Sequence, residues 1–274
     1  MALSLQNSVT RIPNFAHGQI LTLGAYGAYV AQGITNNVIA EAVVAFLIGA
    51  VAAWFMNVAL IRPMVEGKAP PVGIFVVTLA FGFFLNGAVL LFFGGGFYAY
   101  TLPESRAFDL GPFQLTGRSL AIIAASVVVM LALHVVLRYT KFGKSQRAVA
   151  DSRELARVSG IPANRVIALT WLIAGGIAGL GGFALAASVG AFGPALGANF
   201  LLVSFAAAVL GGLGKPYGAM VGALILGITT EISALYIVAS YKDSIAFAVL
   251  ILTLLIRPNG IFTFVRGSLG AAAP

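Results

Sequence analysis

Hydrophobic segments occupy most of the chain, and they limit the folds that it can adopt. All eleven prolines fall outside these segments or at their edges, which is where helix breakers belong if the segments are helices. A helix needs about 20 residues to cross the hydrocarbon core of a bilayer. The eight segments are roughly Ala16–Ile34, Val38–Ile61, Val72–Phe93, Ser119–Leu137, Val166–Ala187, Asn199–Leu213, Tyr217–Ile237 and Ser244–Arg257.

This pattern predicts an all-α fold, a polytopic membrane helix bundle built from about eight hydrophobic segments. The sixth and eighth segments are short for a membrane crossing. We therefore expect them to be half-buried by neighbouring helices or flanked by non-helical backbone. The whole chain, 1–274, is expected to form a single transmembrane domain.

Composition excludes several other classes. Hydrophobic residues make up 60% of the chain and charged residues only 9%, whereas charged residues are about a quarter of a typical globular domain. The net charge of +8 does not indicate nucleic acid, because membrane topology accounts for half of the cations. Cysteine is absent and the two histidines lie far apart, so no metal site is expected. The sequence holds no Ser-His-Asp pattern and no paired carboxylates, and an enzyme is not expected.

The loop charges predict the orientation in the membrane. Lys and Arg follow the second, fourth, sixth and eighth segments, whereas the connections after the first and fifth carry no charge. The charges after the third and seventh segments sum to zero. Since positive loops stay in the cytoplasm, both ends of this chain are expected there. Met1 to Pro13 is short and polar and does not read as a cleavable signal peptide.

The loop from Arg138 to Arg165 carries seven cations and two acids, a net charge of +5. It also contains a helix-forming stretch, for which we expect an N-cap at Ser145, an end at Gly160 and a stop at Pro162. Arg147 and Asp151, four residues apart, are expected to stiffen this helix. A helix in a cytoplasmic loop predicts a docking surface.

Polar residues inside the segments are few, and each has two interpretations. Glu231 either lines a polar path or hydrogen-bonds to neighbouring Thr and Ser residues near the outer interface. Asn57 and Asn86 are interhelical hydrogen-bonding groups or substrate contacts. Glu41 and His134 lie close to segment ends and are expected to reach the interface.

Glycines recur at every fourth residue in two places, Gly175 with Gly179 and Gly214 with Gly218 and Gly222. Such glycine faces let helices approach closely. The pattern favours tight packing within the chain over an interface with another subunit.

The residues Asn14-Phe15-Ala16-His17-Gly18 resemble a signature of the permease subunits of branched-chain amino acid ABC importers, the LivH-like group. The loop with Arg147, Gly160 and Arg165 resembles the coupling loop of that family. Further likenesses are Ala208 to Gly214, Glu231 with the later Tyr241-Lys242-Asp243, and Arg257 to Phe262, so that the resemblance runs from Arg11 to about Phe264. Family members usually begin with another hydrophobic helix, where this chain has thirteen mostly polar residues.

The resemblance implies a function and a set of partners. The protein would be the permease of an importer in the prokaryotic cytoplasmic (inner) membrane, embedded in lipid, without a cofactor of its own because partner subunits bind ATP. Those partners would be a second permease, identical or different, two ATP-binding subunits and a periplasmic binding protein that delivers a small-molecule substrate. Alternatives are a urea or short-amide permease of the same family, and a secondary transporter or channel.

The resemblance also assigns roles to particular residues. The loop 138–165 would be the cytoplasmic coupling loop that contacts the ATPases, with a docking set of Arg147, Ala148, Asp151, Glu154, Ala156, Gly160 and Arg165. The translocation path would include Asn14, His17, Gly18, Asn86 and Glu231.

Overall fold

The computed structural model describes residues 1–100, 107–110, 113–236, 238, 241–256 and 260–261. Contacts divide the chain into two compact units, Ala2–Leu202 and Val203–Pro274. Most of the Arg257 to Phe262 motif lies outside the described residues.

The predicted hydrophobic segments are helices in the structure. In the first unit these are α2 (His17–Thr35), α5 (Pro71–Phe93), α6 (Gly117–Tyr139), α9 (Ala163–Val189), and α3 (Val38–Phe55), which continues through the π-helix η1 (Met56–Ile61) into α4 (Arg62–Glu66). Shorter helices are α1 (Ala2–Thr10), α7 (Lys141–Asp151) and α8 (Arg153–Val158). The remaining helices are α10 (Leu196–Gly211), which runs from the first unit into the second, α11 (Pro216–Ser233) and α12 (Lys242–Ile256).

The core of the first unit lies where α9 packs on α2 and α3. A Cβ atom at Gly179 would overlap the backbone of Ala45, and one at Gly24 would overlap the backbone of Gly179. Gly175 likewise faces the backbone of Gly49. Glycine is required at these positions because the helix backbones touch. The expected packing within the chain is therefore confirmed for Gly175 and Gly179.

The second unit uses the same device at the bend between α10 and α11, which cross at 117°. Gly218 and Gly222 of α11 contact the backbone of α10 around Gly211. Gly214 instead lies in the connecting turn, with a φ of 82°. The short segments are also as expected, since α10 has 16 residues and α12 has 15.

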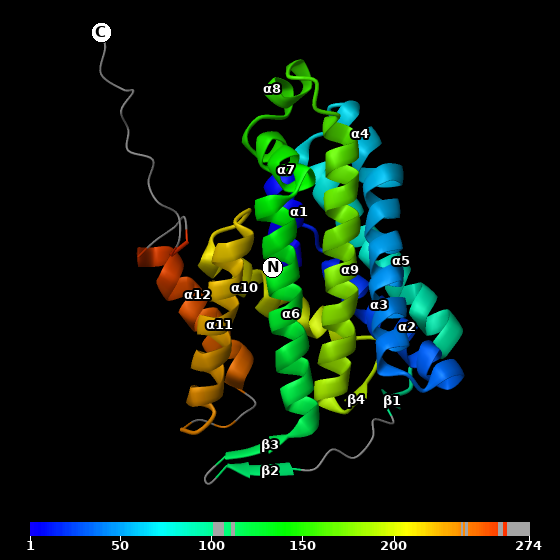
Figure 1. Cartoon of the computed structure of the whole chain (residues 1–274), viewed down its shortest axis with the longest axis vertical. Coiled ribbons are helices and arrows are strands. Elements are labelled where there is room, and N and C mark those ends of the chain that lie inside the picture. Colours follow the sequence, from blue (N-terminus) through cyan, green and yellow to red (C-terminus); the bar gives the residue numbers. More distant parts are fainter. Residues whose placement is uncertain (101–106, 111–112, 237, 239–240, 257–259, 262–274) are drawn as a thin grey trace. The chain divides into compact units, whose positions relative to one another are not determined.

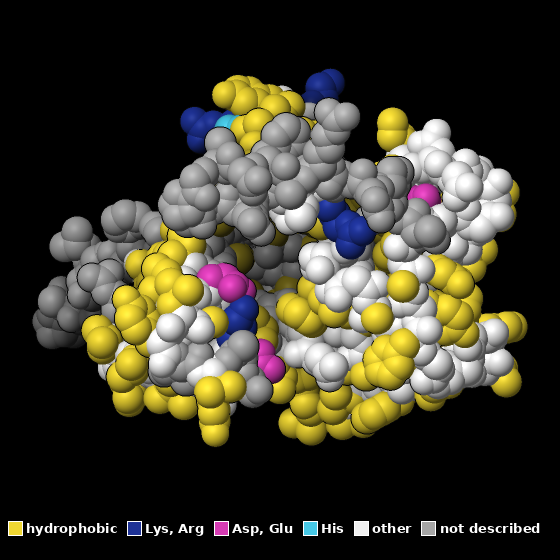
Figure 2. Space-filling model, turned by 90° about the horizontal axis from the view of Figure 1, so that it is seen from below, with side chains coloured by type: hydrophobic (Ala, Val, Ile, Leu, Met, Phe, Trp, Pro, Cys, Tyr) yellow, Lys and Arg dark blue, Asp and Glu magenta, His cyan; other side chains and the backbone are white. Residues whose placement is uncertain are grey.

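Several helices can cross a membrane. Within the described residues, four spans are long and apolar enough, Val38–Glu66, Pro71–Phe93, Gly117–Tyr139 and Ala163–Val189. The bent pair α10 with α11 has the composition of a broken span or of a re-entrant loop. In α6 only Leu133 and Leu137 are buried, so most of its apolar side chains face outward. Hydrophobic side chains also cover much of the visible surface in Figure 2. The chain is therefore a multi-pass membrane protein.

Short strands tie together two connections of the first unit. β1 (Tyr98–Ala99) pairs antiparallel with β4 (Ala191–Phe192), so that the connections after α5 and α9 meet. β2 (Ala107–Leu110) and β3 (Phe113–Thr116) form a hairpin. The β1 and β4 pair lies at one end of this unit, and α4, α7 and α8 lie at the opposite end (Figure 1). This arrangement matches the predicted alternation of the loops.

Candidate functional site

The loop that was expected to dock a partner contains two helices rather than one. Thr140 Oγ1 caps α7 by accepting from the Gly143 amide at 3.1 Å. Ser152 Oγ caps α8 by accepting from the Leu155 amide at 3.3 Å. The predicted cap at Ser145 is wrong: this residue lies within α7, and its hydroxyl donates to the Lys141 carbonyl at 3.0 Å. The helix starts earlier because Thr140, directly after α6, already has the extended backbone of an N-cap residue.

The predicted end of the helix at Gly160 is confirmed. Gly160 has a φ of 79°, the left-handed conformation in which glycine carries no steric penalty. Its amide donates to the Arg157 carbonyl at 3.0 Å, and the Ile161 amide donates to the Ala156 carbonyl at 2.9 Å. These bonds satisfy the carbonyls at the end of α8.

The outer surface of α8 is partly apolar. Leu155 and Val158 are 69% and 88% exposed, although the loop carries many charges. Ala156, which the resemblance places in the docking set, is only 3% exposed and faces the bundle. Sequence reasoning therefore missed the two most exposed apolar side chains of this helix. The available signal was an aliphatic pair in a segment predicted to lie in water.

The rest of the expected docking set divides into residues whose contacts hold α7 against the bundle and residues described only by their exposure. Arg147 donates to the Leu137 carbonyl of α6, and Arg11 donates to the carbonyls of Ala150 and Asp151 at 3.4 and 3.5 Å, so that α7 is tied to the bundle. Within the described residues, Arg147 and Asp151 form no ion pair with each other. Ala148 is half-buried, whereas Glu154 and Arg165 are exposed.

The Asn14 to Gly18 stretch lies inside the bundle, at a break between α1 and α2. Asn14 is 1% exposed. Its Nδ2 donates to Gln6 Oε1 at 3.0 Å, while its Oδ1 accepts from the Ala16 amide at 3.0 Å. His17 is also buried, and within the described part of the chain its Nδ1 has no hydrogen-bond partner. A Cβ atom at Gly18 would overlap the backbone of Gly197.

A cavity of about 530 Å³ lies near the β1 and β4 end of the first unit. Asn86 of α5 contributes to its wall and is half-buried, and its Oδ1 has no partner among the described residues. The wall is otherwise mostly apolar, with Leu90, Phe97, Leu196 and Phe200, and it has a second amide at Asn199. An apolar wall with a few polar groups is typical of a small-molecule site.

An aromatic cluster beside this cavity was not predicted. Tyr26 of α2 lies 4.6 Å from Phe93 and 5.2 Å from Phe192, between ring centroids. The Tyr100 hydroxyl donates to the Ala25 carbonyl, and burial raises the pKa of this hydroxyl. The cluster draws its rings from four separate parts of the sequence, so no local pattern could indicate it.

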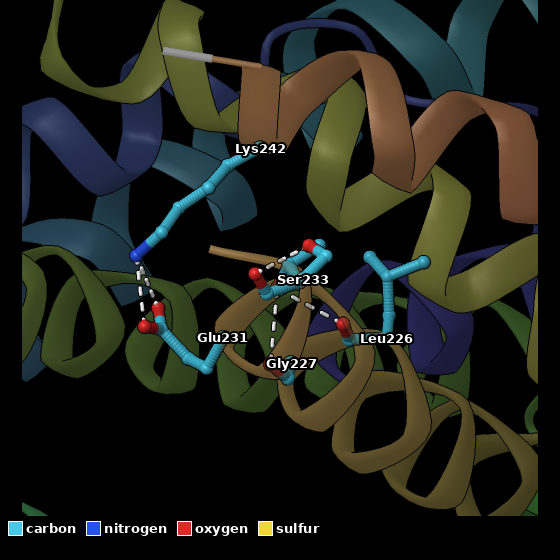
Figure 3. Close-up of polar contacts among 6 residues, drawn as sticks. Leu226, Gly227, Glu231, Ser233 and Lys242 are labelled. Carbon is cyan, nitrogen blue, oxygen red and sulfur yellow. Dashed lines mark hydrogen bonds and ion pairs between the residues drawn. The ribbon is translucent and has the colours of Figure 1, made fainter. Parts of the chain in front are cut away.

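Glu231 lies in the second unit and forms an ion pair. Both of its carboxylate oxygens are 2.8 Å from Lys242 Nζ, and its side chain is 72% exposed (Figure 3). The neighbouring hydroxyls of Thr229, Thr230 and Ser233 donate to backbone carbonyls instead. The interpretation that Glu231 hydrogen-bonds to these neighbours is therefore wrong, because the hydroxyls are taken up by the helix backbone.

Two further polar residues of the first unit are buried, and for Glu41 this differs from the expectation. Glu41 was expected to reach the interface but is buried, because its position in α3 brings it against α2, where it hydrogen-bonds to the Gln32 side chain. Asn57 of η1 is buried and lines a second cavity near α8. Within the described residues, no group of His, Asp and Glu is placed to hold a metal ion.

Comparisons with known proteins add an independent finding. A protein family described as the permease component of branched-chain amino acid transport systems matches residues 1–254. The high-affinity branched-chain amino acid permease LivH of Escherichia coli K12 is 33% identical, over 90% of this chain and 84% of its own. BraD of Pseudomonas aeruginosa is 30% identical, over 90% of this chain and 85% of its own. The ribose import permease RbsC of Escherichia coli K12 is 28% identical, over 88% and 75%. No solved structure matches the chain significantly.

Proposed function

The chain belongs to the family of branched-chain amino acid ABC transporter permeases, and from this premise we propose that it forms the translocation path of an importer in the prokaryotic cytoplasmic membrane. Two ATP-binding subunits drive transport, a second permease subunit completes the path, and a periplasmic binding protein delivers the substrate. The observation that carries the proposal is the exposed apolar surface of α8, at the end of the first unit opposite β1 and β4. We call α8 the coupling helix.

The exposed surface of the coupling helix fits a protein partner better than it fits water or lipid. Leu155 and Val158 project from a strongly basic loop, where an isolated apolar pair gains nothing from exposure. Burying each of them against a partner contributes about 1.5–3 kcal/mol. Glu154 beside them is exposed and supplies a charge that fixes the orientation of a partner. The expected partner is an ATP-binding subunit.

The cavity that contains Asn86 supports the substrate class. Its aliphatic and aromatic wall suits a branched side chain, and the amides of Asn86 and Asn199 suit the ammonium and carboxylate groups of an amino acid. It lies at the end of the unit expected to face the binding protein. Asn14, His17 and Gly18 act differently in this proposal, because they are buried and shape the break between α1 and α2.

A second candidate is import of a more polar solute, such as a sugar, urea or short amide. The similarity to a ribose import permease favours it, since that relative is 28% identical over 88% of this chain. Competition separates the two: leucine, isoleucine and valine should compete with one another for uptake, whereas ribose, urea and acetamide should not. Efficient competition by the polar solutes alone would favour the second candidate.

Docking is tested by placing acidic residues at the exposed apolar positions of the coupling helix. Leu155→Asp with Val158→Asp should insert into the membrane normally, fail to co-purify with the ATP-binding subunits, and abolish ATP-dependent uptake. Lys144→Gln is the matched control, since Lys144 is an exposed residue of the same loop outside the coupling helix. Full uptake by the double variant, or uptake driven by an ion gradient without ATP, would contradict the proposal.

A further inference from the structure

Asn164, the second residue of α9, holds a hydrogen-bonded cluster beside the coupling helix. Its Oδ1 accepts from Arg153 at 2.7 Å and from Arg157 at 2.9 Å, both on the coupling helix. Its Nδ2 donates to Glu66 Oε1 of α4 at 2.9 Å. Glu66 Oε1 also accepts from Arg62 Nε at 3.0 Å. We name these five residues the Asn164 junction.

An amide is well suited to the centre of this junction. The amide oxygen faces two guanidinium groups and the amide nitrogen faces a carboxylate, so both ends of the side chain meet a group of complementary charge. An aspartate would place a second carboxylate against Glu66, and a leucine would leave all of these contacts unmade. Arg153 is partly buried, which lowers the pKa of its guanidinium group and shields its contacts from water.

A cavity of about 350 Å³ lies behind the coupling helix. Its wall includes Arg153 and Glu154 from that helix, Ile61 and Arg62 from near the end of the span Val38–Glu66, and Ile167 from α9. Side chains on opposite walls of a cavity do not press on one another, so close packing transmits little force across it. The hydrogen bonds of the Asn164 junction bridge the same three elements.

The junction contacts two spans, Val38–Glu66 and α9, and each has a feature that suits it to respond to a movement of the coupling helix. The span that ends at Glu66 contains the π-helix η1 (Met56–Ile61), directly before Arg62. Such non-α turns within long helices are frequent at functional sites. The other span, α9, forms the centre of the glycine-packed core with α2 and α3. A displacement of Asn164 therefore acts at the first turn of α9, the most buried of the four candidate spans.

We propose that Asn164 is a positioning residue that transmits the movement of the coupling helix to the span Val38–Glu66 and to α9 during transport. This inference rests on the proposed function, because it requires an ATPase to move the coupling helix. Docking uses the outer face of that helix, with Leu155 and Val158. Transmission uses its other contacts, through Arg153 and Arg157. The two roles are therefore separable by substitution.

The test compares ATP hydrolysis with uptake in the complete transporter reconstituted in liposomes. Asn164→Leu keeps the approximate size of the side chain and removes its hydrogen bonds. We expect this variant to co-purify with the ATP-binding subunits and to hydrolyse ATP, but to import less leucine per ATP by about 5-fold or more, in the range typical of coupling between sites. Glu66→Gln, which keeps an acceptor oxygen, should remain near the parent ratio, whereas Glu66→Leu should resemble Asn164→Leu.

A double variant and a control complete the test. If Asn164 and Glu66 act through one junction, the Asn164→Leu with Glu66→Leu variant should lose no more than the stronger single variant. Lys144→Gln should leave the ratio of imported leucine to hydrolysed ATP unchanged.

Two outcomes would overturn the inference. One is an unchanged ratio in both Asn164→Leu and Glu66→Leu. The other is loss of the ATP-binding subunits from Asn164→Leu alone, since that result would assign Asn164 to docking. Failure of the parent protein to bind these subunits would instead overturn the proposed function. If Asn164→Leu does not fold, the partly exposed Glu66 still decides the question.

Discussion

Different kinds of contact hold together the helical core of the first unit and the end of that unit that carries α4, α7 and α8. We call this end the coupling-loop end. In the core, α9 meets α2 and α3 backbone to backbone at Gly24, Gly49 and Gly179, with no space for even one methyl group. At the coupling-loop end, long polar side chains bridge a cavity of about 350 Å³. Close packing resists displacement, whereas hydrogen bonds across a cavity can be exchanged. The core is therefore expected to resist displacement more strongly than the coupling-loop end does.

The largest effect is expected where the core is most crowded. Gly179→Val should destabilise the protein by about 3 kcal/mol or more, because its side chain overlaps the Ala45 backbone. The unfolding midpoint of the purified protein in detergent, together with its yield from membranes, measures this effect. Gly87→Ala is the control, since a Cβ atom at Gly87 of α5 meets nothing within 4 Å. Equal stability of the two variants would mean that the core tolerates displacement and would remove the contrast.

A smaller loss of stability is expected at the break between α1 and α2. Asn14→Leu leaves the Ala16 amide and the side-chain oxygen Gln6 Oε1 without their partner, and each buried unpaired group costs about 1–3 kcal/mol. We expect a lower unfolding midpoint and, in proportion, lower uptake. Asn14→Asp, which keeps the acceptor for the Ala16 amide, should be the milder change if capping dominates. Normal stability but lost uptake would assign Asn14 to the path instead.

At the coupling-loop end, a substitution should affect function more than stability. Gly160→Asp introduces a side chain at a φ of 79° and costs about 1 kcal/mol locally. A Cβ atom there meets nothing within 4 Å inside the chain, so the bundle is expected to remain folded. Uptake and co-purification with the ATP-binding subunits should nevertheless fall sharply. Gly160→Asn, which tolerates the same backbone conformation, should retain both.

The smallest effect is expected at the exposed ion pair of the second unit. Glu231→Gln removes the charge that pairs with Lys242, and exposed pairs of this kind contribute about 0–1 kcal/mol. We expect an unchanged unfolding midpoint, and uptake then reports on whether Glu231 belongs to the path. Lys242→Gln is the matched variant. A large fall in stability for either variant would show that polar contacts stabilise this protein as strongly as the glycine packing does.

Sequence reasoning located the helices well because membrane spans are defined by length and hydrophobicity. A span needs about 20 apolar residues whose backbone groups are hydrogen-bonded within the helix, and both properties can be recognised from one continuous stretch of sequence. The end of the helix at Gly160 could be predicted for the same reason, because the signal is a single glycine followed closely by a proline. The N-cap was predicted at Ser145 instead of Thr140, because several Ser and Thr residues in the loop offer the same side-chain oxygen. Only the course of the preceding helix selects Thr140. The expectation of a single transmembrane domain stays a prediction.

The sequence by itself thus determined the helical membrane bundle, the alternation of its charged loops and the presence of helix in the basic loop 138–165. Only the tertiary structure decided which sides of these elements meet. It turned Ala156 inward and Leu155 outward, drew the aromatic rings around β1 and β4 together, and placed Asn164 between Glu66 and two arginines. The physical reason is one of range. Hydrophobic length and helix capping act over a few residues, whereas the contact of Asn164 with Glu66 and the pairing of β1 with β4 join residues tens of positions apart, whose approach depends on the packing of the whole unit.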